Sequence, residues 1–66
     1  MEVTLNGETK QVADGITVAK LLESLQIVPE RVVVELNMTI LKRAQLALTV
    51  IKPADQIEIV HFVGGG

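Results

Sequence analysis

Residues 56–66 read Gln-Ile-Glu-Ile-Val-His-Phe-Val-Gly-Gly-Gly, an alternating apolar stretch that runs directly into three glycines. The alternation predicts a strand over residues 56–62, with Ile57 and Ile59 pointing toward a core. Glycine has no Cβ, so Gly64 and Gly65 predict a thin, flexible tail that can enter a narrow slot in another protein. We expect the α-carboxylate of Gly66 to be ionised at neutral pH and able to attack a phosphate ester.

The N-terminal half of the chain predicts a hairpin followed by a helix. Asn6-Gly7 is suited to a type I′ turn between strands over residues 1–5 and 9–13. Thr17 is expected to be the N-cap of a helix over residues 18–26, whose apolar residues recur at helical spacing on one face.

The second half of the chain predicts more strands. A β-branched run over residues 31–36 and a short apolar pair at residues 40–41 indicate two of them, and residues 42–46 fit a single helical turn. One amphipathic helix must cover one apolar face of the resulting sheet. We therefore expect an α+β, ubiquitin-like β-grasp domain over residues 1–63, with a mixed sheet of four to five strands packed on one main helix. Residues 64–66 form the expected flexible tail.

The strand at residues 56–62 also predicts an exposed apolar surface. If Ile57 and Ile59 face the helix, then Val60 and Phe62 face outward, with Val33 on the same face, and together they would suit a docking surface for a partner. The alternative is that Phe62 folds over the sheet edge and Val60 is an isolated surface residue. His61 shares the face of Ile59, so we expect it to cap the end of the core and to have no catalytic role.

The composition excludes several functional classes. The chain has 66 residues, a net charge of −2, no cysteine and one histidine. These numbers rule out a disulfide framework, a thiolate site or a histidine metal cluster within the chain. The net charge also gives no excess of basic residues with which to bind nucleic acid. Residues 1–4 lack the basic start of a signal peptide, and no apolar run is long enough to span a membrane. We expect a soluble, cytoplasmic domain without bound metal or cofactor.

The blocks at residues 5–8, 17–22, 32–37 and above all 57–66 resemble the ThiS-type sulfur carriers of thiamine biosynthesis. The Val-His-Phe sequence before the glycines is the most specific part of this resemblance. Two positions depart from the family pattern, which often has glycine where this chain has Met38 and another glycine where it has Ala54. Both departures lie in expected turns, so they concern local turn geometry and leave the expected tail chemistry unchanged.

The resemblance implies a protein co-substrate that is not itself an enzyme. A ThiF-type adenylating enzyme would use ATP and Mg²⁺ to activate the Gly66 carboxylate. A cysteine desulfurase or a sulfurtransferase would provide persulfide sulfur, leaving Gly66 as a thiocarboxylate, and thiazole synthase would accept that sulfur. Gly64 and Gly65 would contribute through their small size and backbone flexibility, and not through chemistry. We expect a monomer, because a carrier must move between enzymes.

Two other readings remain open from the sequence. The first is a sulfur carrier of molybdopterin synthesis or of tRNA thiolation, which would share the fold and the terminal glycines. The second is a non-catalytic β-grasp interaction module whose glycine tail is inert, because frayed termini are common.

Overall fold

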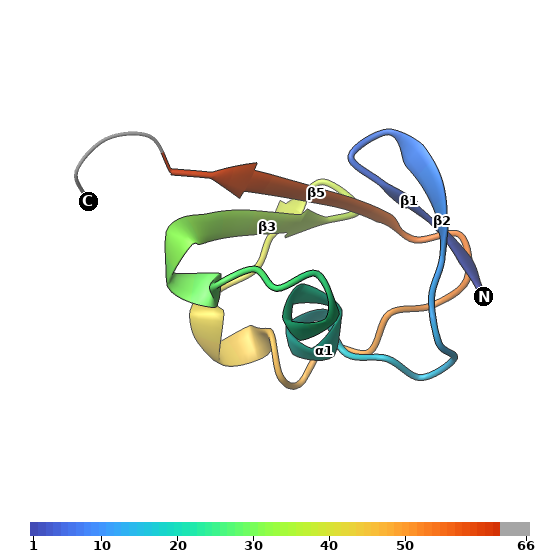
Figure 1. Cartoon of the computed structure of the whole chain (residues 1–66), viewed down its shortest axis with the longest axis horizontal. Coiled ribbons are helices and arrows are strands. Elements are labelled where there is room, and N and C mark those ends of the chain that lie inside the picture. The colour runs from blue at the N-terminus through green and yellow to red at the C-terminus, as the bar shows by residue number, and fades with distance from the viewer. Residues whose placement is uncertain (63–66) are drawn as a thin grey trace.

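In the part of the chain that the structure describes, a five-stranded mixed sheet has one α-helix packed against one face (Figure 1). The computed structural model describes residues 1–62; Val63 and the predicted tail residues Gly64, Gly65 and Gly66 lie outside the described part of the chain. The elements are, in order, β1 (Glu2–Leu5), β2 (Glu8–Gln11), α1 (Val18–Ser24), the 3₁₀ turn η1 (Pro29–Arg31), β3 (Val32–Leu36), β4 (Thr39–Ile40), the 3₁₀ turn η2 (Arg43–Gln45) and β5 (Gln56–His61). The predicted β-grasp architecture is confirmed.

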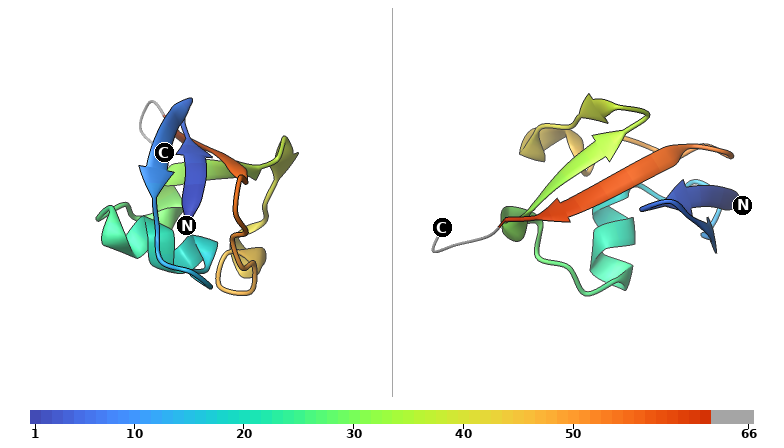
Figure 2. Two further views of the ribbon diagram at one scale, coloured as in Figure 1. Left: turned by 90° about the vertical axis from the view of Figure 1, so that its right-hand side faces the viewer. Right: turned by 90° about the horizontal axis from the view of Figure 1, so that it is seen from above.

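Strand β5 joins two hairpins into one sheet. The strand order is β2-β1-β5-β3-β4, with β5 parallel to β1 and antiparallel to β3. The β1–β2 and β3–β4 pairs are antiparallel hairpins on either side of β5. The two additional views show α1 on one face of this sheet and the other face uncovered (Figure 2).

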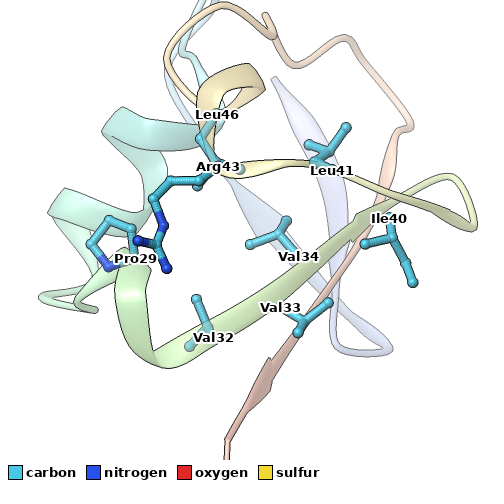
Figure 3. Close-up of a pocket in the computed structure, with 8 residues that line it drawn as sticks. All are labelled: Pro29, Val32, Val33, Val34, Ile40, Leu41, Arg43 and Leu46. Carbon is cyan, nitrogen blue, oxygen red and sulfur yellow. The ribbon is translucent and has the colours of Figure 1, made fainter. Parts of the chain in front are cut away.

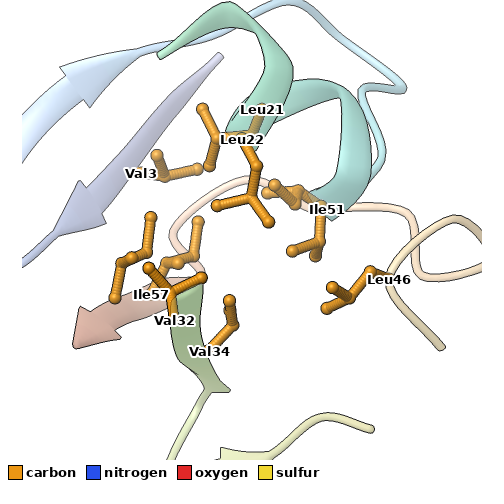
Figure 4. Packing of buried hydrophobic residues seen from close by; sticks show 10 residues of the cluster. Val3, Leu21, Leu22, Val32, Val34, Leu46, Ile51 and Ile57 are labelled. Atoms are coloured by element: carbon orange, nitrogen blue, oxygen red, sulfur yellow. The ribbon is translucent and has the colours of Figure 1, made fainter. Parts of the chain in front are cut away.

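The core lies between α1 and the sheet. Its members are all less than a tenth exposed, and they come from the helix, from three strands and from the segment between η2 and β5 (Figure 4). They are Val3, Val18, Leu21, Leu22, Val32, Val34, Leu46, Ile51, Ile57 and Ile59. Ile57 and Ile59 face the helix as predicted, and full burial of each such side chain contributes about 1.5–3 kcal/mol.

Both ends of α1 are set by local hydrogen bonds. Thr17 is the N-cap, as predicted, and its Oγ1 accepts from the Lys20 amide at 3.2 Å. The helix ends earlier than the predicted residue 26, because Gln26 takes a left-handed φ of 59°. The amide of Ile27 then donates to the Leu22 carbonyl at 2.9 Å, and that of Gln26 to the Glu23 carbonyl at 3.0 Å. These two bonds form a Schellman motif, in which glycine is the usual left-handed residue.

The other element boundaries differ little from the predictions. β2 ends at Gln11, although the Val12 amide still donates to the Met1 carbonyl at 2.8 Å. β4 is shifted back by one residue to Thr39–Ile40, and β5 ends at His61 in place of Phe62. The helical turn predicted for residues 42–46 is present as η2.

Two turns contain non-glycine residues in the left-handed conformation, with positive φ, that glycine usually adopts. Asn37 and Met38 have φ of 51° and 71° between β3 and β4, and Ala54 has φ of 70° before β5. Met38 and Ala54 both lie in turns predicted from the sequence, and these turns form without glycine at either position. For a residue with a Cβ, this backbone conformation raises the conformational energy by roughly 1–2 kcal/mol. Met38 gains little packing in return, because it is 88% exposed.

We therefore expect Met38→Gly to stabilise the fold. Relief of the left-handed strain is partly offset by the greater freedom of glycine in the unfolded chain, leaving a net gain of about 0.5–1 kcal/mol. In a domain of this size, that gain raises the melting temperature by about 2–8 °C. Met38→Ala is the matched control in thermal unfolding, since it removes the side chain but keeps the Cβ. Equal melting temperatures for the two variants would contradict the strain argument.

Candidate functional site

The predicted docking residues lie on the uncovered face of the sheet. Val33 on β3 is directly opposite Val60 on β5, and directly opposite residues of an antiparallel pair project from the same face. Phe62 follows Val60 at the period of a strand, and its amide donates to the Arg31 carbonyl at 2.9 Å. Val60 and Phe62 are 56% and 57% exposed, while Val33 is half-buried. The geometry thus places three apolar residues on one face, and their docking role stays a prediction.

His61 lies at the end of β5 on the opposite face. It is paired with Val32, which is buried, so its face is the one predicted. His61 is nevertheless an exposed residue, and the prediction that it caps the core is wrong. The reason is its position in the last residue of β5, beyond Ile59, where the buried stretch of that strand stops.

The side chain of Asn6 holds the middle of β5. Its Oδ1 accepts a hydrogen bond from the Ile59 amide at 2.7 Å, and the backbone N–H of Asn6 donates to the Ile57 carbonyl at 2.8 Å. Asn6 adopts φ of 49° in the turn between β1 and β2, a conformation that asparagine tolerates better than most residues. One residue therefore ends β1 and fastens its hairpin to the strand that carries Val60 and Phe62.

A second asparagine fixes the start of β5. Asn37 Oδ1 accepts from the Gln56 amide at 2.9 Å, and the Asn37 amide donates to the Gln56 carbonyl at 2.8 Å. Its Nδ2 donates to Asp55 Oδ1 at 3.0 Å, while Asp55 Oδ2 accepts from the Lys52 amide at 2.8 Å. This network sets the position at which β5 enters the sheet.

Neither asparagine was singled out in the sequence as a site residue. The only signal was turn chemistry, because asparagine is favoured where a turn needs positive φ. That signal marks the bend of the chain and does not reveal that the amide group reaches a strand far away in the sequence.

One cavity of the described residues lies beside β3 and has no group of catalytic side chains in its lining. This cavity, of about 120 Å³, lies between β3 and the segment that follows it (Figure 3). Apart from Arg43, its lining residues have apolar side chains; they are Pro29, Val32, Val33, Val34, Ile40, Leu41 and Leu46. Within residues 1–62, no group of three or more His, Asp or Glu side chains is placed to hold a metal ion. No helix in this part of the chain has the length and apolar character needed to cross a membrane.

Comparison with known proteins gives a consistent result. The model of the ThiS family matches residues 3–66. The sulfur carrier protein ThiS of Bacillus subtilis (strain 168) is 41% identical over 63 residues, which cover 94% of this chain and 96% of that protein. The crystal structure of a thiamine biosynthesis protein (ThiS) from Geobacter metallireducens superimposes with a TM-score of 0.87 at 38% identity, covering 100% of both chains.

A larger protein also contains a segment similar to this chain. A thiazole synthase from Magnetococcus marinus is 42% identical over 66 residues, which are 100% of this chain. The chain spans only 20% of the length of that thiazole synthase.

The contact between Asn6 and β5 can be tested with a pair of variants. We expect Asn6→Ala to lower the free energy of unfolding by about 1–2 kcal/mol, through loss of the Ile59 hydrogen bond and added strain at positive φ. Asn6→Asp keeps the acceptor oxygen and the tolerance for this conformation, so it should lose less. Chemical denaturation and amide exchange at Ile59 provide the readouts. An Ile59 amide that is equally protected in both variants would contradict the assigned role of the side chain.

Proposed function

The chain belongs to the ThiS family, and on that premise we propose that it carries sulfur for thiazole formation in thiamine biosynthesis. The observation that carries this proposal is the match of the family model over residues 3–66, a range that includes the glycine tail. The near full-length similarity to a sulfur carrier protein of Bacillus subtilis supports the same role. The similarity to part of a thiazole synthase supports thiazole formation as the destination of the sulfur.

In the proposed reaction the Gly66 carboxylate is the reacting group. A ThiF-type adenylating enzyme binds ATP and Mg²⁺, and the carboxylate attacks the α-phosphate, releasing pyrophosphate and forming an acyl-adenylate. A persulfide from a cysteine desulfurase or a sulfurtransferase then attacks the acyl carbon and displaces AMP. This gives an acyl disulfide, and a thiol then attacks its sulfur–sulfur bond, forming a new disulfide and releasing the thiocarboxylate. Thiazole synthase consumes it and returns the carboxylate, so the chain is a recycled co-substrate and not an enzyme.

The described part of the chain contributes binding and orientation. Cysteine is absent from the sequence, so the sulfur chemistry needs thiols supplied by the partners. The C-terminal end of β5 lies on the opposite side of the molecule from the N-terminus (Figure 1). A partner that takes up Gly64, Gly65 and Gly66 can therefore contact Val33, Val60 and Phe62 on the same strand pair. The proposal includes a monomeric carrier in the cytoplasm, where ATP is available for adenylation.

The proposed reaction changes the mass of the chain in a defined way. Incubation with ATP, Mg²⁺, a persulfide source and a ThiF-type adenylating enzyme should replace one oxygen by one sulfur on Gly66, as read by intact mass spectrometry and fragmentation. A chain lacking Gly66 is the control and should stay unchanged. No mass change in the full chain, under conditions that convert a known ThiS carrier, would reject the sulfur-carrier proposal and favour an interaction module.

The proposed docking face, formed by Val33, Val60 and Phe62, can be tested by substitution. Phe62→Ala should weaken binding to the adenylating enzyme by about tenfold, as expected for an aromatic residue at the centre of an interface. Leu48→Ala is the control, because Leu48 is 80% exposed but lies outside the sheet, after η2. Calorimetry on both variants compares the two surfaces. Equal affinities would show that exposed apolar area alone does not make Phe62 a contact residue.

A further inference from the structure

The two edges of β5 are used differently along its length. Its even-numbered residues direct their backbone groups toward β3, as shown by the bond from the Asn37 amide to the Gln56 carbonyl and by the bond from the Phe62 amide to the Arg31 carbonyl. Its odd-numbered residues direct theirs toward β1, where Ile57 and Ile59 are bonded by Asn6. This alternation is the ordinary consequence of strand geometry.

The β1 side of β5 loses its partner halfway along the strand. β1 pairs with β5 only at Thr4 and Leu5, and Asn6 then takes the Ile59 amide with its side chain. Among the residues that the structure describes, no backbone or side-chain hydrogen bond reaches the Ile59 carbonyl or the His61 amide. The second half of β5 extends past the β1–β2 hairpin in the view from above (Figure 2). The central strand of the sheet is therefore an edge strand over residues 59–61.

This edge lacks the protection found at the two outer edges of the sheet. Natural proteins block exposed edges with charged residues, with proline or by keeping the edge strand very short. β2 has the sequence Glu-Thr-Lys-Gln, and β4 contains only 2 residues, so both outer edges follow this rule. Residues 59–61 are Ile-Val-His, with no proline, lysine or carboxylate. This unprotected edge is the one that leads, along the sequence, to the three glycines.

We propose that residues 59–61 of β5 receive an extended segment of the enzyme that takes up the Gly66 carboxylate, so that the enzyme adds a strand to this sheet. The inference rests on the proposed function and specifies how that partner binds. A carbonyl acceptor and an amide donor spaced along one strand edge are matched by the main chain of another extended segment. The interior of a helix cannot match them, because its backbone groups are already paired with each other. Val60 lies within this stretch and Phe62 directly follows it, so one partner can contact the edge and the apolar face together.

Amide exchange in the unmodified chain tests the inference directly. We expect the His61 amide to exchange rapidly in the free chain and at least tenfold more slowly when the chain is bound to a ThiF-type adenylating enzyme. The Ile59 amide is the internal reference and should be protected in both states by Asn6. A bound chain whose His61 amide exchanges at the free rate would overturn the inference. A free chain that is a dimer with a protected His61 amide would assign the edge to a second copy and also overturn it.

Two substitutions at His61 give an independent test. His61→Pro removes the open N–H, while the hydrogen bonds of Val60 and Phe62 toward β3 remain possible, and proline is tolerated where the N–H faces away from the ladder. His61→Ala removes the same side chain but keeps the N–H. We expect the proline variant to bind the enzyme about three- to tenfold more weakly than the alanine variant, the effect of one lost hydrogen bond. Equal affinities of two folded variants would overturn the inference, and if the proline variant does not fold, amide exchange decides.

The same experiments separate this inference from the proposed function. A wild-type chain that binds the enzyme but gains no sulfur on Gly66 would reject the proposed function, while protection at His61 would still support the added strand. A chain that gains sulfur with an unprotected His61 amide would reject the added strand alone. A chain that does not bind the enzyme at all would reject both.

Discussion

The position of β5 between two hairpins is the constraint on which the rest of the structure depends. β1–β2 and β3–β4 have no ladder with each other, so they form one sheet only through β5. The burial of Ile57 and Ile59 beneath α1 fixes which face of β5 is inside, and Val60 and Phe62 are outside as a direct result. A shift of β5 by one residue would reverse these faces. Asn6 and Asn37 oppose such a shift, because each bonds the β5 backbone at a defined residue.

Much of this arrangement could be predicted from hydrophobic periodicity. The period-two pattern of residues 56–62 and the helical stripe of residues 18–25 are local signals, and they indicated the strands, the helix and the outward face of Val60. The start of α1 was equally local, since Thr17 caps the helix through a residue three positions away. The glycine tail could be recognised as a candidate site from sequence alone, because a reactive chain end needs no tertiary structure to bring it together.

The rest could not be predicted, because it depends on contacts between distant residues or on unusual backbone conformations. The bond from Ile59 to Asn6 joins residues 53 positions apart, and a turn pattern contains no information about it. The end of α1 was misplaced because Gln26 adopts a conformation in which glycine would be expected. His61 has the parity of a core residue but lies past the buried part of its strand. Each of these features is set by tertiary structure, which overrides the local pattern.

The order of the strands along the chain has a consequence for how the protein acquires its structure during synthesis. β5 is the last of the described elements to be made, yet it is the strand through which β1 and β3 become part of one sheet. Until it emerges, the two hairpins have unpaired inner edges and α1 has only part of its core. Contacts between distant segments form late because closing long loops is entropically costly. The sheet therefore closes after translation has passed residue 61, and the nascent chain exposes aggregation-prone strand edges until then.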